Sequence, residues 1–323
     1  MIRIHHLLAL AAAAAVPLHA TAQQSYPAKP VRLIVPSPPG SIADFVARSV
    51  GQELSTRLGQ PWVIDNRPGA NQVIGIDACA KAAGDGYTTC LVSIDTMSLN
   101  PLLMANLPYD AVKDFKPVSN LFYITQGLIA AASVPASSTK ELQALAAAKP
   151  GSLNFSTLGA GTNPDVFRHW LSEKWKSGIV GVPYKGGILA ANAVVSGEVQ
   201  LSWIGIGNIV GQAQAGKVKI LTVNSARRSR AFPNVPTLKE VGLEEFAEKV
   251  WWGLSAPAAT PEAIIARLNK ELARAYQEPK FLGLLEGRFL EPAYTTAEAF
   301  VAFMKADRER AARVIKAFNV PKQ

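Results

Sequence analysis

The sequence predicts an α/β protein built from two domains. Strand-like and helix-like apolar patterns alternate along the whole chain, which is typical of sheets flanked by helices. The mature length of roughly 300 residues exceeds what one hydrophobic core usually serves, so two domains are the default. Two polar turns, one in each half of the chain, each lead into a helix. We therefore expect two helix N-termini to face one cleft and to bind a carboxylate there.

The first strand and the turn after it form the most informative pattern. Residues 31–35 read as a strand that is buried on both faces. Ser41 and Asp44 have the spacing of a capping box, and apolar residues every four positions then mark one face of a helix. The free N–H groups and the dipole of such a helix start favour an anion. A lone turn of this kind is usually a simple cap, and it is the second turn that makes this one a ligand candidate.

The next elements contain the two cysteines and a further polar strand end. A strand is expected at 62–65, then a helix that carries Cys79 and a strand at 88–93 that carries Cys90. A helix that folds back onto this strand would allow a disulfide, whereas two buried thiols with diverging side chains fit as well. Thr96 follows the strand and is expected at the level of the cleft, because ligands of open α/β sheets bind beyond the carboxyl ends of the strands.

The second polar turn spans residues 156–165. Asn163 suits an N-cap, Pro164 suits the first helical position and Asp165 favours the first turn. The glycines of the turn let the backbone approach a ligand closely. The predicted binding residues of this turn are Gly159, Ala160, Gly161, Thr162 and Asn163.

The remaining elements continue the alternation. Ser138 and Glu141 cap a helix, strands are expected at 153–157, 179–182, 199–204 and 219–224, and helices at 260–276 and 296–318. The strand at 179–182 leads into Tyr184, Lys185 and Gly186, which we add to the predicted site. Trp203 lies near the end of another strand. Both core packing and contact with a ligand fit this residue.

The N-terminus predicts export. Arg3 precedes an apolar run from Leu7 to Val16, and small residues follow at Ala20–Ala22. This is the pattern of a Sec signal peptide at residues 1–22, too short for a membrane span, with cleavage after Ala22. The protein is therefore expected in the periplasm.

Composition excludes several function classes. The net charge of +9 comes from scattered basic residues. The densest group, at 227–230, is more typical of a solvated loop than of a nucleic-acid-binding motif. His169 is the only histidine after the signal peptide, so a histidine-based triad or a multi-histidine zinc site is not expected. No metal site and no cofactor are predicted.

A series of short motifs extends over nearly all of the mature sequence. In order, they are residues 26–32 (YPAKPVR), 35–40 (VPSPPG) with Asp44, 65–70 (DNRPGA), 85–88 (DGYT), 107–110 (LPYD), 182–186 (VPYKG) and 233–237 (PNVPT). In these motifs the chain resembles the Bug-type extracytoplasmic solute receptors of tripartite tricarboxylate transporters.

The resemblance implies a two-lobed, type II-like periplasmic-binding-protein (Venus flytrap) fold, in which each lobe is a mostly parallel sheet flanked by helices. It implies no cofactor, a carboxylate ligand in the cleft, and transfer to the large and small membrane subunits of a permease. The family's binding loops map here onto 38–44, which includes Pro39, Gly40, Ser41 and Asp44, and onto 159–163. Lobe 1 is expected at 23–120 and 226–323 and lobe 2 at 121–225. The receptor is expected to be a monomer.

The chain departs from the family pattern at Gln200 and at Ile204-Gly205, where relatives often carry acids. Without those acids a ligand ammonium group would be buried unpaired, which favours amine-free aliphatic or aromatic acids. Two other functions remain open: a sensor subunit that presents its ligand to a signalling ectodomain, and an exported carboxylate-processing enzyme.

Overall fold

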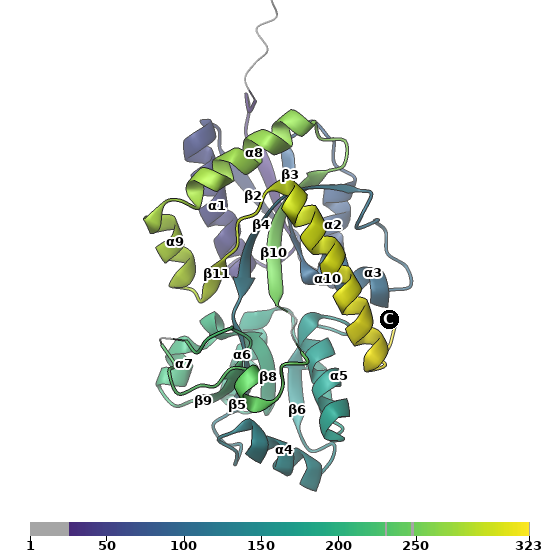
Figure 1. Cartoon of the computed structure of the whole chain (residues 1–323), viewed down its shortest axis with the longest axis vertical. Coiled ribbons are helices and arrows are strands. Elements are labelled where there is room, and N and C mark those ends of the chain that lie inside the picture. Colours follow the sequence, from purple (N-terminus) through teal and green to yellow (C-terminus); the bar gives the residue numbers. More distant parts are fainter. Residues whose placement is uncertain (1–25, 230, 247–248, 323) are drawn as a thin grey trace, which may run out of the picture.

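The computed structural model describes residues 26–229, 231–246 and 249–322. The predicted signal peptide, its cleavage site after Ala22 and Arg230 of the basic loop lie outside the described residues. Two sheets stacked along the long axis, each flanked by its own helices, form two lobes (Figure 1).

The first sheet has six strands in the order β11-β4-β10-β3-β1-β2. The strands are β1 (Val31–Val35), β2 (Trp62–Asn66), β3 (Thr88–Ser93), β4 (Phe115–Ile124), β10 (Val250–Pro257) and β11 (Leu290–Pro292). Its helices are α1 (Ile42–Leu58), α2 (Val73–Ala80), α3 (Asn100–Leu103), α8 (Glu262–Ala275), α9 (Pro279–Glu286) and α10 (Ala297–Ala317), with a π-helical turn η1 (Asp95–Leu99) after β3.

The second sheet has five strands in the order β7-β6-β8-β5-β9. The strands are β5 (Gln126–Ala131), β6 (Asn154–Thr157), β7 (Val180–Pro183), β8 (Leu201–Gly205) and β9 (Val218–Val223). The helices of this lobe are α4 (Thr139–Ala148), α5 (Asn163–Trp175), α6 (Gly187–Ser196) and α7 (Val210–Gln214), with short 3₁₀ turns η2 (Ile206–Asn208) and η3 (Lys239–Val241).

Most strands of each sheet run in one direction, as the sequence predicts. In the first sheet β10 pairs antiparallel with both β3 and β4, and β11 also runs against β4. In the second sheet β5 is antiparallel to both of its neighbours, β8 and β9. The first sheet therefore contains two reversed strands, β10 in its interior and β11 at its edge, and the second sheet contains one, β5. β5 and β10 are also the first strands after the two passages between the lobes.

The chain crosses between the lobes twice. β4 stays in the first sheet until Ile124, and β5 begins at Gln126. On the return, Thr237 still forms a parallel bridge with Val223 of β9, and β10 begins only at Val250. The lobe boundaries expected from the sequence put these passages at 120/121 and 225/226. We propose instead that lobe 2 spans 126–246, because the pairing of Thr237 holds the segment after β9 on the second sheet.

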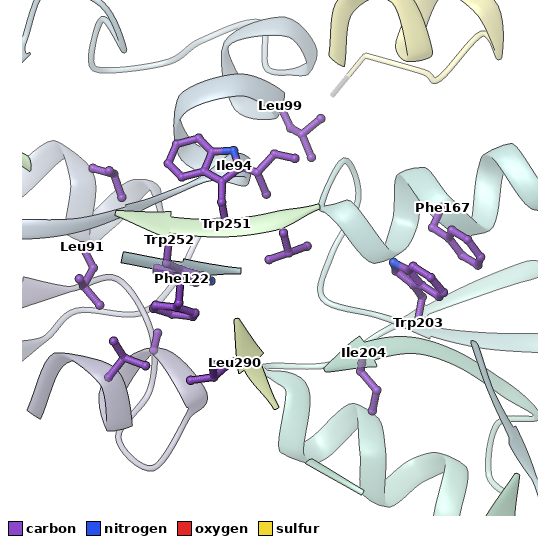
Figure 2. Packing of buried hydrophobic residues seen from close by; sticks show 14 of the residues in the cluster. Leu91, Ile94, Leu99, Phe122, Phe167, Trp203, Ile204, Trp251, Trp252 and Leu290 are labelled. Atoms are coloured by element: carbon purple, nitrogen blue, oxygen red, sulfur yellow. The ribbon is translucent and has the colours of Figure 1, made fainter. Parts of the chain in front are cut away.

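Aromatic residues fill the interior on both sides of the passages. Trp251 packs edge-on against Phe300 of α10, with ring centroids 5.5 Å apart. In lobe 2, Trp203 stacks on Phe167 at 3.9 Å and 8° between the ring planes (Figure 2). Offset and edge-on pairs of this kind add about 0.5–1.5 kcal/mol beyond the burial of their surface.

A buried acid on α10 fixes the turn after β3. Asp307 accepts hydrogen bonds from Trp251 Nε1 at 2.8 Å and from Ser98 Oγ of η1 at 2.6 Å, and it pairs with Arg310. The position of η1, and of Asp95 at its start, is therefore fixed from behind by the C-terminal helix.

The two cysteines are bonded. Cys79 of α2 and Cys90 of β3 form a disulfide with their Cα atoms 6.2 Å apart, which decides between the two alternatives left open by the sequence. Within the described residues, the helices include none that is both long and apolar enough to traverse a bilayer.

Candidate functional site

A cavity of about 130 Å³ lies between the two sheets. Both lobes contribute to its wall, and so do both passages between them. The lining residues are Ser37, Pro38, Ser41, Ile42, Ala43, Gln72, Asp95, Ile124, Gln126, Leu158, Asn163, Pro164, Gly186, Gly187, Ile188, Trp203, Ile204, Gly205, Asn208, Val250 and Trp252. Most are apolar, and this wall, drawn from the described part of the chain, includes no lysine or arginine.

The start of α1 presents free backbone donors to the cavity. Ser41 is the N-cap, and its hydroxyl accepts from Asp44 N–H at 3.2 Å, as predicted. The N–H groups of Ile42 and Ala43 have no hydrogen-bond partner in the described structure, and both residues line the cavity. A helix N-terminus of this kind attracts an anion through its N–H groups and its dipole.

Asp44 shapes this helix start but lies outside the cavity wall. Its carboxylate accepts from Gly40 N–H at 2.9 Å, from Asn66 Nδ2 at 3.0 Å and from the Arg48 guanidinium at 3.0 Å. Desolvation opposes ionisation most strongly, yet the hydrogen bonds from Arg48, Gly40 and Asn66 together lower the pKa of Asp44. The predicted ligand residue is therefore a positioning residue that folds the turn back onto α1.

The start of α5 differs from the prediction. The N-cap is Thr162 rather than Asn163, and its hydroxyl donates to Gly159 O at 2.6 Å instead of capping the helix. Asn163 N–H donates to Asp95 Oδ1 at 2.9 Å, Pro164 has no N–H, and Asp165 N–H bonds to Thr162 O. Among the first three helical positions of α5, every donor is already used. The expectation that this helix start offers its N–H groups to a ligand is therefore wrong.

Asp95 takes the place of a ligand anion at α5. It lies in lobe 1 at the start of η1 and lines the cavity, and its second oxygen accepts from Gln72 Nε2 at 3.0 Å. Burial raises the pKa of Asp95 to about 6, against the lowering effect of the hydrogen bonds from Asn163 and Gln72. The carboxylate thereby connects the two lobes across the cavity.

The loop that carries Gln72 is strained. Ala70, Asn71 and Gln72 all have positive φ, at 45°, 50° and 72°. Consecutive non-glycine residues in this region cost on the order of 1 kcal/mol or more each and persist where contacts enforce them. Asn71 Nδ2 donates to Ala160 O at 2.6 Å, and a Cβ on Gly159 would come 2.6 Å from Asn71 Oδ1. The predicted second turn is thus a docking surface for the other lobe.

The second free helix start belongs to α6. Gly186 is an N-cap without a side-chain hydrogen bond, and Gly186, Gly187 and Ile188 line the cavity. The N–H groups of Gly187 and Ile188 have no hydrogen-bond partner among the described residues. Because α1 and α6 come from opposite lobes, an anion between them would contact both.

Three buried polar atoms that belong to lining residues have no partner in the described structure. They are Gln126 Oε1, Asn163 Oδ1 and Trp203 Nε1. Buried polar groups in proteins are nearly always hydrogen-bonded, so these three atoms are the ones that a ligand in the cavity would be expected to satisfy. Trp203 fits both alternatives left open by the sequence, because its ring packs on Phe167 and the residue also lines the cavity.

The structure brings only some of the predicted residues together. Ser41, Asn163, Gly186 and Trp203 line the cavity, as do the departures Ile204 and Gly205. The others lie outside the wall: Pro39, Gly40, Asp44, Thr96, Gly159, Ala160, Gly161, Thr162, Tyr184 and Lys185. Local bonds account for several of them. Thr96 Oγ1 accepts from Ser93 N–H at 2.9 Å, and Tyr184 Oη donates to Glu198 Oε1 at 2.6 Å.

Gln200 lies outside the cavity wall. It precedes β8, at the strand end opposite the cavity, and its side chain accepts from Asn154 N–H at 3.0 Å. The expectation that the cleft has no acid near the second loop is also wrong, because Asp95 lies there. The sequence predicts a polar strand end here, with Thr96 as its binding residue. The signal for Asp95 is an acid two residues after the end of a buried strand, whereas the hydrophobic pattern gives no indication of Gln72 or Gln126.

Comparisons with known proteins show the family and the fold. Residues 46–320 match the family model for the tripartite tricarboxylate transporter family receptor. The chain is 31% identical over 293 residues to protein BugT of Bordetella pertussis, which covers 90% of both chains.

Two solved structures are similar along nearly the whole chain. The periplasmic binding protein BugD is 29% identical, with a TM-score of 0.85 over 92% of this chain and 100% of its own. MatC from Rhodopseudomonas palustris, solved with bound malate, is also 29% identical, with a TM-score of 0.83 over 90% of this chain and 100% of its own. With a family match across most of its length, this chain belongs to the tripartite tricarboxylate transporter receptor family, whose members are solute receptors.

Proposed function

We propose that this protein is a periplasmic receptor that binds one small carboxylate in the cavity between its lobes. It delivers this ligand to a permease with one large and one small membrane subunit. The family to which it belongs and the malate bound to MatC support this role.

The observation that carries the proposal is the pair of free helix starts at one cavity. Ile42 and Ala43 of α1 and Gly187 and Ile188 of α6 offer N–H groups from opposite lobes. In a wall without lysine or arginine, these donors and the two helix dipoles are the groups that stabilise a negative charge. Binding at both would favour the closed arrangement of the lobes, because the ligand gains contacts only when both helices reach it.

Export to the periplasm would follow from the signal peptide predicted at residues 1–22. The family supports the periplasmic location. Mass spectrometry of the exported protein should give a mature chain that begins at Gln23. A chain retained in the cytoplasm with its first residues intact would contradict export.

Substitutions at Gly187 test the ligand site. Proline is tolerated at the first helical position, so Gly187→Pro removes one N–H donor and keeps α6. Gly187→Ala keeps the donor and is the matched control. We expect calorimetry with a binding carboxylate to give 1:1 stoichiometry in the wild type. The proline variant should bind more weakly by about 1.5–3 kcal/mol, the range for a hydrogen bond to a charged group, and the alanine variant should bind nearly normally.

A failed screen would refute the proposal. A bound ligand stabilises the folded state by about 2.7 kcal/mol at a hundredfold excess over its Kd. If mono-, di- and tricarboxylates and aromatic acids all leave the melting temperature unchanged, carboxylate binding is wrong. Capture of a sensor ectodomain instead of a permease, or turnover of a bound acid, would support one of the two alternative functions.

A further inference from the structure

Asp95, which accepts a hydrogen bond from the first residue of α5, affects which carboxylates fit the cavity. Asn163 N–H is the one donor of that helix start directed at the cavity, and Asp95 Oδ1 accepts from it at 2.9 Å. Asp95 Oδ2 accepts from Gln72 Nε2 at 3.0 Å. Gln72 is itself fixed by Ser93, whose hydroxyl donates to Gln72 Oε1 at 2.8 Å. The carboxylate is therefore held in place by the Gln72 side chain, which Ser93 fixes in turn, and by the Asn163 backbone of the opposite lobe.

The cavity wall therefore combines donors with acceptors. α1 and α6 present unpartnered N–H groups. Asp95 contributes a negative charge, and the lining residues Asn163 and Gln126 each have a buried side-chain oxygen without a partner. Because buried polar groups are nearly always hydrogen-bonded, a ligand that brings a donor to these two oxygens would satisfy them.

We propose that Asp95 selects for ligands with a single carboxylate and excludes dicarboxylates of the same size. The single carboxylate lies between α1 and α6, and the opposite end of the ligand donates hydrogen bonds to the acceptors beside α5. This inference rests on the proposed function, because it names the class of carboxylate that the same cavity takes.

The physical reason is the repulsion between like charges in a buried site. A ligand that fills so small a cavity brings any second carboxylate close to Asp95, where little water screens the two charges. One of the two groups must then be protonated or the complex weakens. A neutral amide or hydroxyl avoids this conflict and gives the unpartnered oxygens a donor.

Acids matched in shape but not in charge test the proposal. Succinate and succinamate differ by one carboxylate in place of an amide, and so do terephthalate and 4-carbamoylbenzoate. For wild-type protein at neutral pH, calorimetry should show each monoanion binding at least about tenfold more tightly than its dianion. In Asp95→Asn, which keeps an oxygen to accept from Asn163 N–H, this preference should fall to within about threefold, because the dianions gain affinity.

Two further variants make the test specific. Asp95→Ser removes the same charge with a smaller side chain and should also lose the preference, which guards against a folding defect in the asparagine variant. Glu278→Gln removes a charge from an exposed ion pair with Arg57, outside the cavity wall, and should keep the wild-type preference.

The outcomes separate the two proposals. If acids bind but wild type, Asp95→Asn and Asp95→Ser share one preference, or if the wild type prefers the dianions, the role of Asp95 is wrong while carboxylate binding stands. If none of the four acids stabilises any variant, carboxylate binding itself fails, and this inference fails with it.

Discussion

At the scale of single residues, Asp95 shows how a buried charge is held in place by neighbours rather than by an ion pair. It accepts hydrogen bonds from Gln72 and Asn163. The Tyr109 hydroxyl is close enough to interact electrostatically with Asp95, but it donates its hydrogen bond to Thr96 O at 2.8 Å. Burial raises the pKa of Tyr109 as well, so that hydroxyl stays neutral. Neutral donors thus stabilise the Asp95 carboxylate only in part.

The raised pKa of Asp95 predicts a pH dependence of stability. Its pKa is about 6 in the folded protein, against an ordinary value of 3.8 for an aspartate. Between these values the folded state binds more protons than the unfolded state, so this group lowers the free energy of unfolding as pH rises. The loss of stability levels off above about pH 7 and is on the order of 3 kcal/mol.

Asp95→Asn removes this titration and isolates the effect. Urea denaturation at several pH values between 4 and 7 should show the variant gaining stability relative to wild type as pH rises. Parallel pH profiles for the two proteins would mean that the Asp95 carboxylate is not desolvated as the structure indicates.

At the scale of elements, the sequence predicted helix starts better than it predicted what they bind. The capping of α1 by Ser41 and the helix start near Asn163 were both readable from local residue preferences. The hydrogen bond from the α5 start to Asp95 could not be predicted in this way, because Asp95 is 68 residues away in the chain. β4 and β10, which carry the chain between the lobes, were also missed. They are fully paired inside the first sheet, and their patterns show no simple alternation.

Thr162→Val tests the corrected role of the α5 turn. The hydroxyl donates to Gly159 O and the residue lies outside the cavity wall, so its loss removes a bond within the turn. We expect the free energy of unfolding to fall by about 1 kcal/mol while the affinity for the carboxylate changes little. Ligand titration and urea denaturation of the same preparation measure both. An affinity loss without a stability loss would place the ligand at this turn after all.

At the scale of the whole molecule, contacts between the lobes occur on more than one side of the cavity. Asn71 of lobe 1 bonds to Ala160 of lobe 2, and Asp95 bonds to Asn163. The C-terminal end of α10 reaches lobe 2 beside α5 in Figure 1. There Phe318 packs edge-on against Trp170, and its carbonyl lies 3.0 Å from His169 Nε2. The protein therefore supplies part of the closing energy from its own side chains.

If contacts between the lobes contribute to the free energy of closure, ligand affinity should depend on a residue outside the cavity wall. Asn71→Ala removes a hydrogen bond that exists only when the lobes meet, and it leaves the lining residues unchanged. The net value of such a bond is about 0.5–1.5 kcal/mol, so the closed population falls and the apparent Kd rises roughly two- to tenfold. Gln52→Ala, which removes an exposed bond within α1, is the matched control and should change neither quantity.

Small-angle scattering of ligand-free protein adds the structural readout. Asn71→Ala should increase the radius of gyration relative to wild type and to Gln52→Ala, and saturating ligand should remove most of the difference. Weaker binding with an unchanged radius in both states would assign the loss to the cavity rather than to closure. Unchanged affinity with an enlarged radius would mean that the ligand alone supplies the energy that closes the lobes.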